Sequence, residues 1–187
     1  MNRPMLIVVT GRGGSGKTTL ARKLGKAAHL PVISRDEIKE GYVRTMGVPH
    51  DELPDGNLIA TNQFFQTVEG LLDGGVSLIA EAAFQHKLWS VRLAPLMEKA
   101  RVVIIVCRPG DDRTAYARYL ERREKEPERV YFHGDPGEAQ QEPPVYDPPH
   151  MDVETILVDT TDGYAPDVDE IIGRILKNPC ENNQKPI

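Results

Sequence analysis

The stretch "GRGGSGKTTL" occupies residues 11–20 and follows the short apolar run "MLIVV" at residues 5–9. Its first eight residues fit the pattern G-x-x-x-x-G-K-[ST] in full, with a strand expected before them and a helix after them. Glycines in such a bend let backbone N–H groups point inward around a polyphosphate, and the positive end of the helix dipole adds to the attraction. An ordinary glycine-rich turn is the alternative. The complete motif in this context favours a phosphate-binding loop.

The loop predicts ATP as the bound nucleotide and Mg²⁺ as its metal ion. Lys17 is expected to bridge the β- and γ-phosphates, and the Thr18 hydroxyl to bind Mg²⁺. The predicted nucleotide-binding residues are Gly11, Gly13, Gly14, Ser15, Gly16, Lys17, Thr18 and Thr19.

Apolar runs and helical periods alternate along the rest of the chain. Strands are predicted at residues 6–10, 32–33, 76–82, 101–107 and 155–159. Helices are predicted at residues 17–28, from about 36, 57–72, 87–99, 111–125 and 167–176, with Pro95 expected to break or kink the fourth. This alternation predicts an α/β fold, with helices on both faces of a mainly parallel sheet. Ligands of such sheets bind beyond the carboxyl ends of the strands.

Composition limits the class of protein. With 187 residues and 40% hydrophobic residues, residues 1–187 are expected to form a single domain. The net charge of −5 gives no overall attraction to nucleic acid or to an anionic membrane. Cys107 and Cys180 form no C-x-x-C pair, so neither a disulfide framework nor a zinc site is indicated. No apolar stretch approaches the ~18 residues of a membrane span. A cytoplasmic protein without a membrane partner is therefore expected.

Two segments lack a helical or strand period. Residues 126–150 are polar and proline-rich, and they are interpreted either as a mobile surface loop or as a flap near the acceptor. Residues 111–150 would then form a lid helix followed by this flap. Residues 179–187 are expected to be a polar tail. The turn-rich residues 159–166 are either an ordinary loop or the place where an adenine rests.

The other motifs distinguish between classes of nucleotide-binding protein. A regulatory GTPase needs N-K-x-D and D-x-x-G motifs, and the chain has neither. A mechanical ATPase usually ends a strand in tandem acids, whereas Glu81 stands alone after "VSLIA". A phosphotransferase needs an acid near the second strand and an arginine-bearing helix that covers the phosphates. The chain has both features.

Asp36, in "VISRDEIKE", is the acid near the second strand. A carboxylate there could accept the proton of an attacking hydroxyl. The alternative is structural, because residues 34–37 ("SRDE") also match a helix capping box. Next to a phosphate-binding loop, the catalytic interpretation is favoured.

The helix at residues 111–125 carries Arg118 and Arg122 four residues apart. Such a like-charge pair costs about a few tenths of a kcal/mol unless an anion neutralises it. A solvated charged helix is the alternative, and binding of phosphate oxygens is favoured. Glu81, at the end of the third strand, is within reach of the metal ion expected at Thr18.

These residues resemble the P-loop kinases, specifically the ATP-binding kinases grouped with AAA-type ATPases. Relatives of that group include polynucleotide 5′-kinase, zeta toxin and chloramphenicol phosphotransferase. The similar segments are "GRGGSGKTT", "ISRDEIK", "IAEAAF" and "ARYLERRE", and only the first is highly specific. The resemblance implies a three-layer α/β/α fold with a five-stranded parallel sheet of strand order 2-3-1-4-5. It also implies a general base at Asp36, lid arginines at Arg118 and Arg122, and an acid near the metal ion at Glu81.

The resulting hypothesis is an ATP- and Mg²⁺-dependent kinase. It would transfer the γ-phosphoryl group to a hydroxyl of a small molecule such as a nucleoside, a sugar or an antibiotic. Asp36, Lys17, Arg118 and Arg122 are the predicted catalytic residues, and Thr18 and Glu81 the predicted metal ligands. A polynucleotide 5′-hydroxyl kinase is the first alternative, less favoured because the chain is acidic. A regulatory protein that hydrolyses ATP slowly or not at all is the second. The acceptor and the oligomeric state are not encoded in a readable motif.

Overall fold

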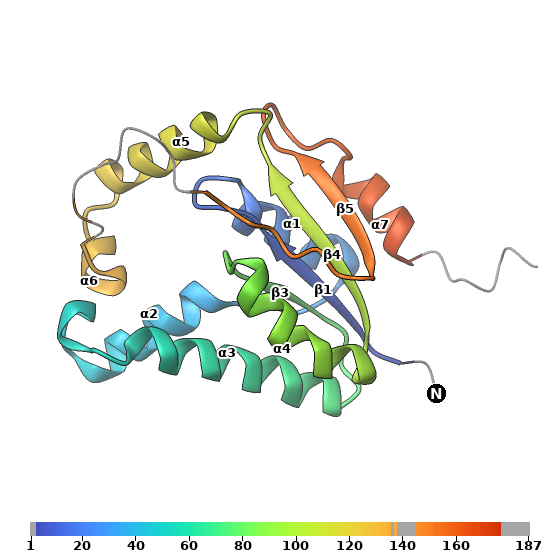
Figure 1. Cartoon of the computed structure of the whole chain (residues 1–187), viewed down its shortest axis with the longest axis horizontal. Helices are drawn as coiled ribbons and strands as arrows, with labels where there is room; N and C mark the ends of the chain where they lie inside the picture. Colours follow the sequence, from blue (N-terminus) through green and yellow to red (C-terminus); the bar gives the residue numbers. More distant parts are fainter. Residues whose placement is uncertain (1–2, 136, 138–144, 177–187) are drawn as a thin grey trace, which may run out of the picture.

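The computed structural model describes residues 3–135, 137 and 145–176 (Figure 1). Its centre is a five-stranded sheet of order β2-β3-β1-β4-β5, in which all neighbouring strands pair in parallel. The strands are β1 (Met5–Thr10), β2 (Val32–Ser34), β3 (Leu78–Glu81), β4 (Arg101–Arg108) and β5 (Glu154–Asp159). The expected fold class and the strand order 2-3-1-4-5 are confirmed.

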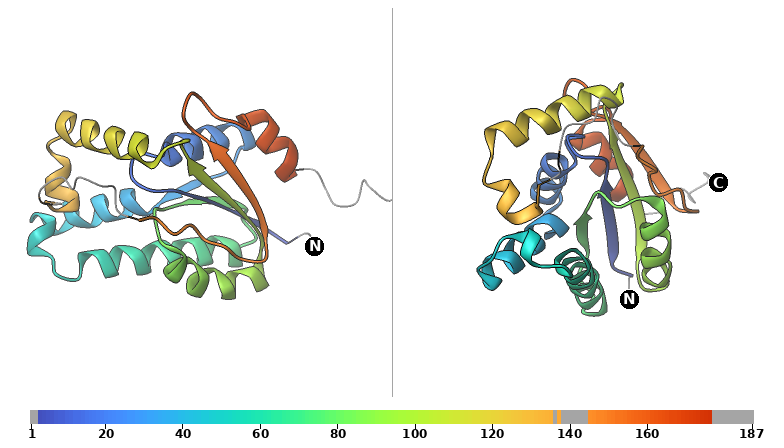
Figure 2. Two further views of the ribbon diagram at one scale, coloured as in Figure 1. Left: turned by 45° about the horizontal axis from the view of Figure 1, so that its top comes forward. Right: turned by 60° about the vertical axis from the view of Figure 1, so that its left-hand side comes forward.

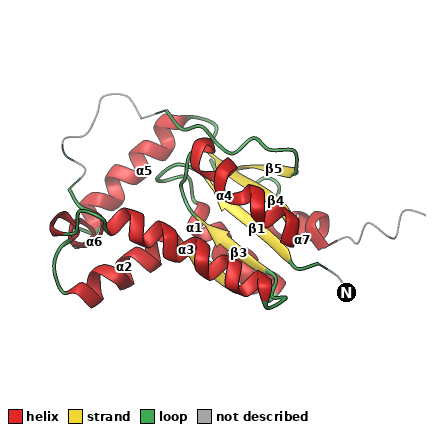
Figure 3. Ribbon diagram, turned by 60° about the horizontal axis from the view of Figure 1, so that its bottom comes forward, coloured by secondary structure: helices red, strands yellow, loops and turns green. Residues whose placement is uncertain are grey.

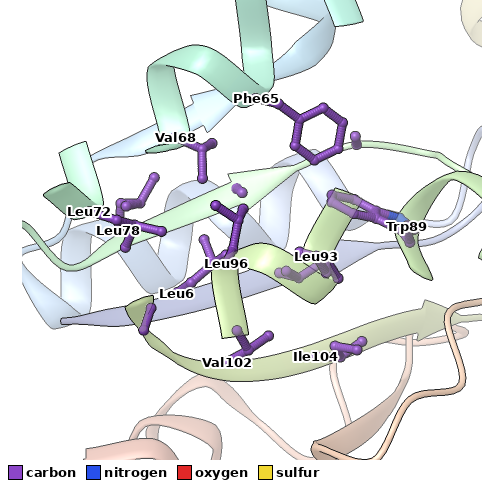
Figure 4. Close-up of a cluster of buried hydrophobic side chains, with 14 of the residues drawn as sticks. Leu6, Phe65, Val68, Leu72, Leu78, Trp89, Leu93, Leu96, Val102 and Ile104 are labelled. Carbon is purple, nitrogen blue, oxygen red and sulfur yellow. The ribbon is translucent and has the colours of Figure 1, made fainter. Parts of the chain in front are cut away.

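Alternate residues of the central strands point to opposite faces of the sheet and pack into two separate hydrophobic cores. On one face, Leu6 and Val8 pack with α3 (Gly56–Asp73) and α4 (His86–Lys99), in the cluster of Figure 4. On the other face, Ile7 and Val9 pack with α1 (Lys17–Ala28) and α7 (Val168–Leu176). Both faces of β1 are buried, which explains its continuous apolar sequence. Figure 3 shows the helices on both sides of the sheet.

A second group of helices lies beyond the carboxyl ends of the strands. β2 leads directly into α2 (Arg35–Met46), which packs along α3, and the short 3-10 helix η1 (His50–Glu52) connects the two. α5 (Asp112–Lys125) extends from the end of β4 toward α6 (Arg129–His133), and α6 contacts α2 and η1 (Figure 2). The helix expected at residues 111–125 is therefore present as α5.

The structure corrects the expectation for the segment after α5. Residues 126–150 were expected to have no regular structure, yet Arg129–His133 forms α6. A single helical turn is too short to produce a detectable period, and its contacts with α2 and η1 hold it in place. The proline-rich residues 138–144 and the expected tail at 179–187 lie outside the described residues.

Pro95 does not break its helix, since α4 runs from His86 to Lys99 with Pro95 inside it. Proline removes the hydrogen bond to the carbonyl four residues earlier, which belongs to Val91. Val91 is 69% exposed, so water can bind that carbonyl. No helix among the described residues has the length and apolar character required to cross a membrane.

Candidate active site

The phosphate-binding loop joins β1 to α1 at the carboxyl edge of the sheet. Gly16 precedes α1 with φ 81°, and no side chain caps the first turn of the helix. The amide groups of this turn are therefore available to an anion. Gly14 has φ 78°, and a Cβ atom there would collide with the carbonyl oxygen of Ala115 in α5. The loop thus packs against α5 at a distance that only glycine allows.

Lys17, Thr18 and Glu81 come together beside this loop. The Glu81 carboxylate is 2% exposed, and its Oε1 lies 3.7 Å from Lys17 Nζ and 3.3 Å from Thr18 Oγ1. Its Oε2 accepts a 2.7 Å hydrogen bond from the Ser34 hydroxyl. The sheet register explains this cluster. Glu81 of β3 is paired with Ser34 of β2 on one side and with Val9 of β1, the strand that leads into the loop, on the other.

These residues fit a magnesium ion bound together with a nucleotide. Mg²⁺ in nucleotide sites is held by one or two protein oxygens, with phosphate oxygens and water completing the octahedron. A hydroxyl and a buried carboxylate oxygen face each other here, at Thr18 and Glu81. Among the described residues, no group of three or more His, Cys, Asp or Glu side chains is arranged to hold a metal ion by protein ligands alone.

Asp36 lies in the first turn of α2, and its side chain is 47% exposed. Arg35 Nη1 lies 3.5 Å from Asp36 Oδ1. Burial by itself would raise the pKa of Asp36. The positive charges of Lys17, His133, Arg35 and Arg129 outweigh this effect and lower the pKa below the usual value for an aspartate. Asp36 is therefore an ionised carboxylate at neutral pH.

The capping-box interpretation of residues 34–37 does not hold. The hydroxyl of Ser34 donates to Glu81 and makes no hydrogen bond to the start of α2. In a cap, the Ser34 oxygen would accept a hydrogen bond from a backbone N–H of α2. Here no such bond forms, and the hydroxyl instead donates to the Glu81 carboxylate at the neighbouring strand end.

Asp36 and Lys17 line the same cavity, which has a volume of about 210 Å³. Its walls come from the phosphate-binding loop, α2, the end of β3, the end of α5 and α6. The lining residues are Gly13, Lys17, Asp36, Ala83, Tyr119, Arg122, Arg123, Glu126, Arg129, Val130, His133 and Gly134.

The two predicted lid arginines occupy different places. Arg122 lines the cavity and forms no ion pair with any carboxylate of the described residues. Arg118 does not line it; its guanidinium donates to the carbonyl oxygens of Thr160 (2.8 Å) and Thr161 (2.7 Å), in the loop after β5. One arginine thus faces the cavity and the other holds the loop proposed for adenine.

Ser15 and Thr19 complete the predicted nucleotide site. Ser15 is buried, and its Oγ has no hydrogen-bond partner among the described residues. Gly11 requires its glycine, because a Cβ there would meet Ser15 Oγ and the carbonyl of Cys107. Thr19 is exposed on the first turn of α1.

Several residues that line the cavity were not predicted as site residues from the sequence. Arg123 and Arg129 belong to the charged, arginine-rich segment at residues 118–129, which is the signal that could have indicated them. His133 carries no such signal, because it lies in a segment without a period. Its Nε2 lies 2.8 Å from Glu40 Oε1, and Lys39 Nζ donates to its carbonyl oxygen at 3.3 Å. These contacts attach α6 to α2.

The end of the proline-rich segment reaches the base of the phosphate-binding loop. Tyr146 Oη lies 2.7 Å from Thr10 Oγ1, the last residue of β1. Thr10 Oγ1 also donates to the carbonyl of Ala82 and accepts from Trp89 Nε1. Trp89 is fully buried, so it contributes to packing. The segment thus supports the strand end from which the loop starts.

Comparisons with known proteins agree with this geometry. A family model described as an AAA domain matches residues 6–142. A crystal structure described as a "putative kinase" from Chloroflexus aurantiacus is similar, with 25% identity and a TM-score of 0.78, covering 93% of this chain and 97% of that one. A comparison with curated protein sequences gave no significant match.

Two further solved structures share the fold at lower identity. A gluconokinase from Sinorhizobium meliloti has 16% identity and a TM-score of 0.55, with 92% of each chain covered. A chain of the Pnkp1/Rnl/Hen1 RNA repair complex has 20% identity and a TM-score of 0.54, covering 67% of this chain and 39% of that one. From the family match, the sheet order and the phosphate-binding loop together, the chain belongs to this AAA domain family within the P-loop kinase superfamily.

Proposed function

We propose that the chain is an ATP- and Mg²⁺-dependent kinase that transfers the γ-phosphoryl group of ATP to a hydroxyl of a small molecule. One observation carries the proposal: Lys17 of the phosphate-binding loop and the ionised Asp36 line one cavity. A nucleotide phosphate and an acceptor hydroxyl could meet there. The family and the kinase neighbours support the same class of reaction.

Each residue has a role set by its position. Lys17 and the amides of the first α1 turn bind the phosphates, and Thr18 and Glu81 would hold Mg²⁺, which offsets phosphate charge when bound. Asp36 orients the acceptor hydroxyl and accepts its proton as the oxygen attacks. Arg122 faces the cavity and stabilises the charge that builds up on the transferring group. For Arg118 the contacts with residues 160–161 support a role at the nucleotide end.

The size of the cavity favours a small acceptor. Its volume of about 210 Å³ is below the roughly 300–1,000 Å³ typical of drug-sized ligand pockets. α6 packs against α2 and forms one wall of the cavity, whereas a polynucleotide strand is bound in a groove that follows its backbone. A small acceptor is therefore proposed over a polynucleotide.

Transfer of labelled phosphate tests the proposal. The purified chain is incubated with γ-labelled ATP, Mg²⁺ and a pooled library of metabolites and oligonucleotides, with Asp36→Asn as the matched control. Label on a small hydroxyl compound with the wild type, and its loss with Asp36→Asn, supports the proposal. Label on oligonucleotide 5′ ends favours the polynucleotide alternative. Nucleotide-dependent partner binding that survives Asp36→Asn, without label transfer, favours the regulatory alternative.

A further inference from the structure

The imidazole of His133 forms part of the cavity wall near the proposed general base. His133 is the last residue of α6, and it lines the cavity together with Asp36. Its side chain is 20% exposed, and each of the two residues acts on the pKa of the other. Figure 1 shows α6 facing α2 across this end of the molecule. Because the cavity is small, a compound bound in it can contact both side chains.

The partners of the ring determine which of its nitrogens carries the hydrogen. Nε2 of His133 lies 2.8 Å from Oε1 of Glu40 and 3.3 Å from Nη2 of Arg129. A carboxylate only accepts and a guanidinium only donates, so a neutral ring bonds with just one of them through Nε2. The contact with the carboxylate is shorter and charge-assisted, and we therefore assign the hydrogen to Nε2. Nδ1 then carries a lone pair.

This lone pair is available to a ligand. Within the described part of the chain, the hydrogen bonds of the His133 ring all involve Nε2. The pKa of His133 is lowered, chiefly by burial, so the ring is neutral above pH 6.5 and Nδ1 can accept a hydrogen bond. Most charged side chains of the cavity are cations, which donate but never accept. They are Lys17, Arg122, Arg123 and Arg129, against the carboxylates of Asp36 and Glu126.

The helix α2 carries both groups that such a site needs. Asp36 and Glu40 are four residues apart, so their side chains lie on the same face of α2. Glu40 fixes the tautomer and the orientation of the His133 ring, while Asp36 faces the cavity directly. The two carboxylates repel each other slightly at this spacing. A shared purpose at the cavity gives a reason for keeping both.

We propose that the phosphate acceptor is a polyhydroxy compound, such as a sugar or a nucleoside, and that Nδ1 of His133 accepts a hydrogen bond from its second hydroxyl while the first faces Asp36. The inference rests on the proposed kinase function and narrows its substrate class. A hydroxyl donates to Nδ1 and at the same time accepts from a neighbouring cation such as Arg129. An ionised carboxylate has no hydrogen to donate, so it would leave Nδ1 unpaired.

Two variants separate a ligand contact of His133 from a structural one. In His133→Gln the amide takes the place of Nε2 and still donates to Glu40, but nothing replaces Nδ1. In His133→Asn the amide takes the place of Nδ1 and does not extend to Glu40. A ligand contact predicts that His133→Gln raises the KM for the acceptor about 3- to 10-fold, with kcat and the KM for ATP nearly unchanged, and that His133→Asn is less affected. A purely structural role predicts the reverse order of the two variants, which overturns the inference.

Monodeoxy analogues identify the second hydroxyl. Glucose, ribose and adenosine, and the monodeoxy analogues of each, are offered to the chain with γ-labelled ATP and Mg²⁺. For an accepted parent compound, the analogue without the second hydroxyl is expected to have a kcat/KM about 3- to 10-fold lower with the wild type, and no lower with His133→Gln. His29→Asn, at the exposed histidine that ends α1, is the control and should match the wild type. An equal loss in the wild type and in His133→Gln overturns the inference.

NMR of the ¹⁵N-histidine-labelled chain gives a readout that needs no phosphoryl transfer. The His133 signals are identified by their absence from His133→Gln. At pH 8 they should show the hydrogen on Nε2, and the Nδ1 signal should shift when a parent compound is added with Mg²⁺ and a non-hydrolysable ATP analogue. A hydrogen on Nδ1, or no shift with any of the three parent compounds, overturns the inference.

The contact should also depend on pH. Burial holds the pKa of His133 below the ordinary 6.5, although Glu40 and Asp36 act in the opposite direction. Protonation of Nδ1 removes the lone pair, so kcat/KM for the acceptor should fall as the pH decreases below 6.5, and this limb should be absent from His133→Gln. A limb that is unchanged in His133→Gln contradicts the contact. The charged and titratable groups around the ring are Asp36, Lys39 and Glu40 on α2, His50 and Asp51 on η1, Arg129 on α6, and Lys17, Arg122, Arg123 and Glu126 along the cavity.

The two proposals fail in different ways. Label transfer with the same selectivity by the wild type and His133→Gln keeps the kinase function and refutes the role of His133. A hydroxyl-dependent shift of Nδ1, with no label transfer to any compound, keeps the binding role and refutes the kinase function.

Discussion

The Ser34 hydroxyl donates a 2.7 Å hydrogen bond to Glu81 Oε2, which joins the end of β2 to the end of β3. The other carboxylate oxygen of Glu81 faces Thr18 and Lys17. Since α2 begins directly after Ser34, this one contact fixes the helix that carries Asp36 relative to the phosphate-binding loop. The nucleotide side and the acceptor side of the proposed site are thereby held in one geometry.

Ser34→Ala should weaken the proposed metal site and the fold together. Glu81 would lose a buried hydrogen bond, which costs about 1–3 kcal/mol of unfolding free energy. The Mg²⁺ concentration for half-maximal activity should rise as the carboxylate loses its orientation. Urea unfolding and a Mg²⁺ titration measure the two effects. Thr45→Ala, at an exposed hydroxyl of α2, serves as the control and should stay within about 0.5 kcal/mol of the wild type.

Asp36→Asn should lower turnover by about 10²- to 10⁴-fold, because the amide accepts no proton from the attacking hydroxyl. ATP affinity should stay nearly unchanged, since Asp36 is on α2 and not in the phosphate-binding loop. Single-turnover kinetics and nucleotide titration separate the two quantities. Normal phosphorylation by this variant would contradict the role of Asp36.

The pH profile of the wild type should reflect the lowered pKa of Asp36. Burial opposes ionisation, but the charges of Lys17, His133 and Arg35 outweigh it, so the pKa falls below the ordinary 3.8. The reactive carboxylate is present above this pKa and is lost only as pH falls through it. kcat/KM should therefore show no acid limb due to Asp36 above pH 4. A limb near pH 6 that disappears in Asp36→Asn would be inconsistent with this electrostatic environment.

The two lid arginines should give different kinetic defects. Arg122→Met removes a cation from the cavity wall and should lower kcat by about 10²- to 10³-fold with a small change in the KM for ATP. Arg118→Met releases the carbonyls of Thr160 and Thr161 and should chiefly raise the KM for ATP. Steady-state kinetics at varied ATP distinguish them. Identical defects would show that both arginines act on the same group.

Gly14→Ala should abolish nucleotide binding, because a Cβ atom would collide with Ala115 and strain a backbone of φ 78°. Gly41→Ala is the matched control. Gly41 lies inside α2 with open space around it, so alanine should stabilise the fold by about 0.5–1 kcal/mol and leave binding intact. Fluorescent-nucleotide titration and thermal unfolding report the two outcomes. Intact binding by Gly14→Ala would mean that the loop and α5 separate freely.

Lys39 should make stability depend on alkaline pH. Its pKa is about 8 in the folded chain and 10.5 for the free side chain, mainly because burial disfavours the charge. Between these values the unfolded chain binds the proton that the folded chain has lost, so the free energy of unfolding rises with pH. Relative to Lys39→Met, the wild type should gain stability from pH 8 to pH 10. Chemical denaturation at pH 7, 8, 9 and 10 measures the difference, and parallel curves would exclude a buried, depressed Lys39.

Features that depend on a few neighbouring residues could be predicted from the sequence. The phosphate-binding loop could be predicted because its glycines and Lys17 act over eight consecutive residues. The parallel sheet followed from the spacing of apolar strands, whereas its strand order came from resemblance. Asp36 could be proposed as a site residue because a strand end directs its neighbours to the ligand edge of the sheet.

The residues that meet across that edge became known from the folded structure. Ser34 binds Glu81 rather than capping α2, and the two are 47 positions apart. α6 became a cavity wall because α2 and η1 hold a turn too short to be detected by its period. Arg118 and Arg122 look equivalent in sequence, yet their surroundings differ. Arg118 binds the loop after β5, whereas Arg122 lines the cavity, because the elements packed around α5 decide what each guanidinium contacts. Contacts between distant segments depend on sheet register and helix packing, and these cannot be predicted from a local sequence pattern.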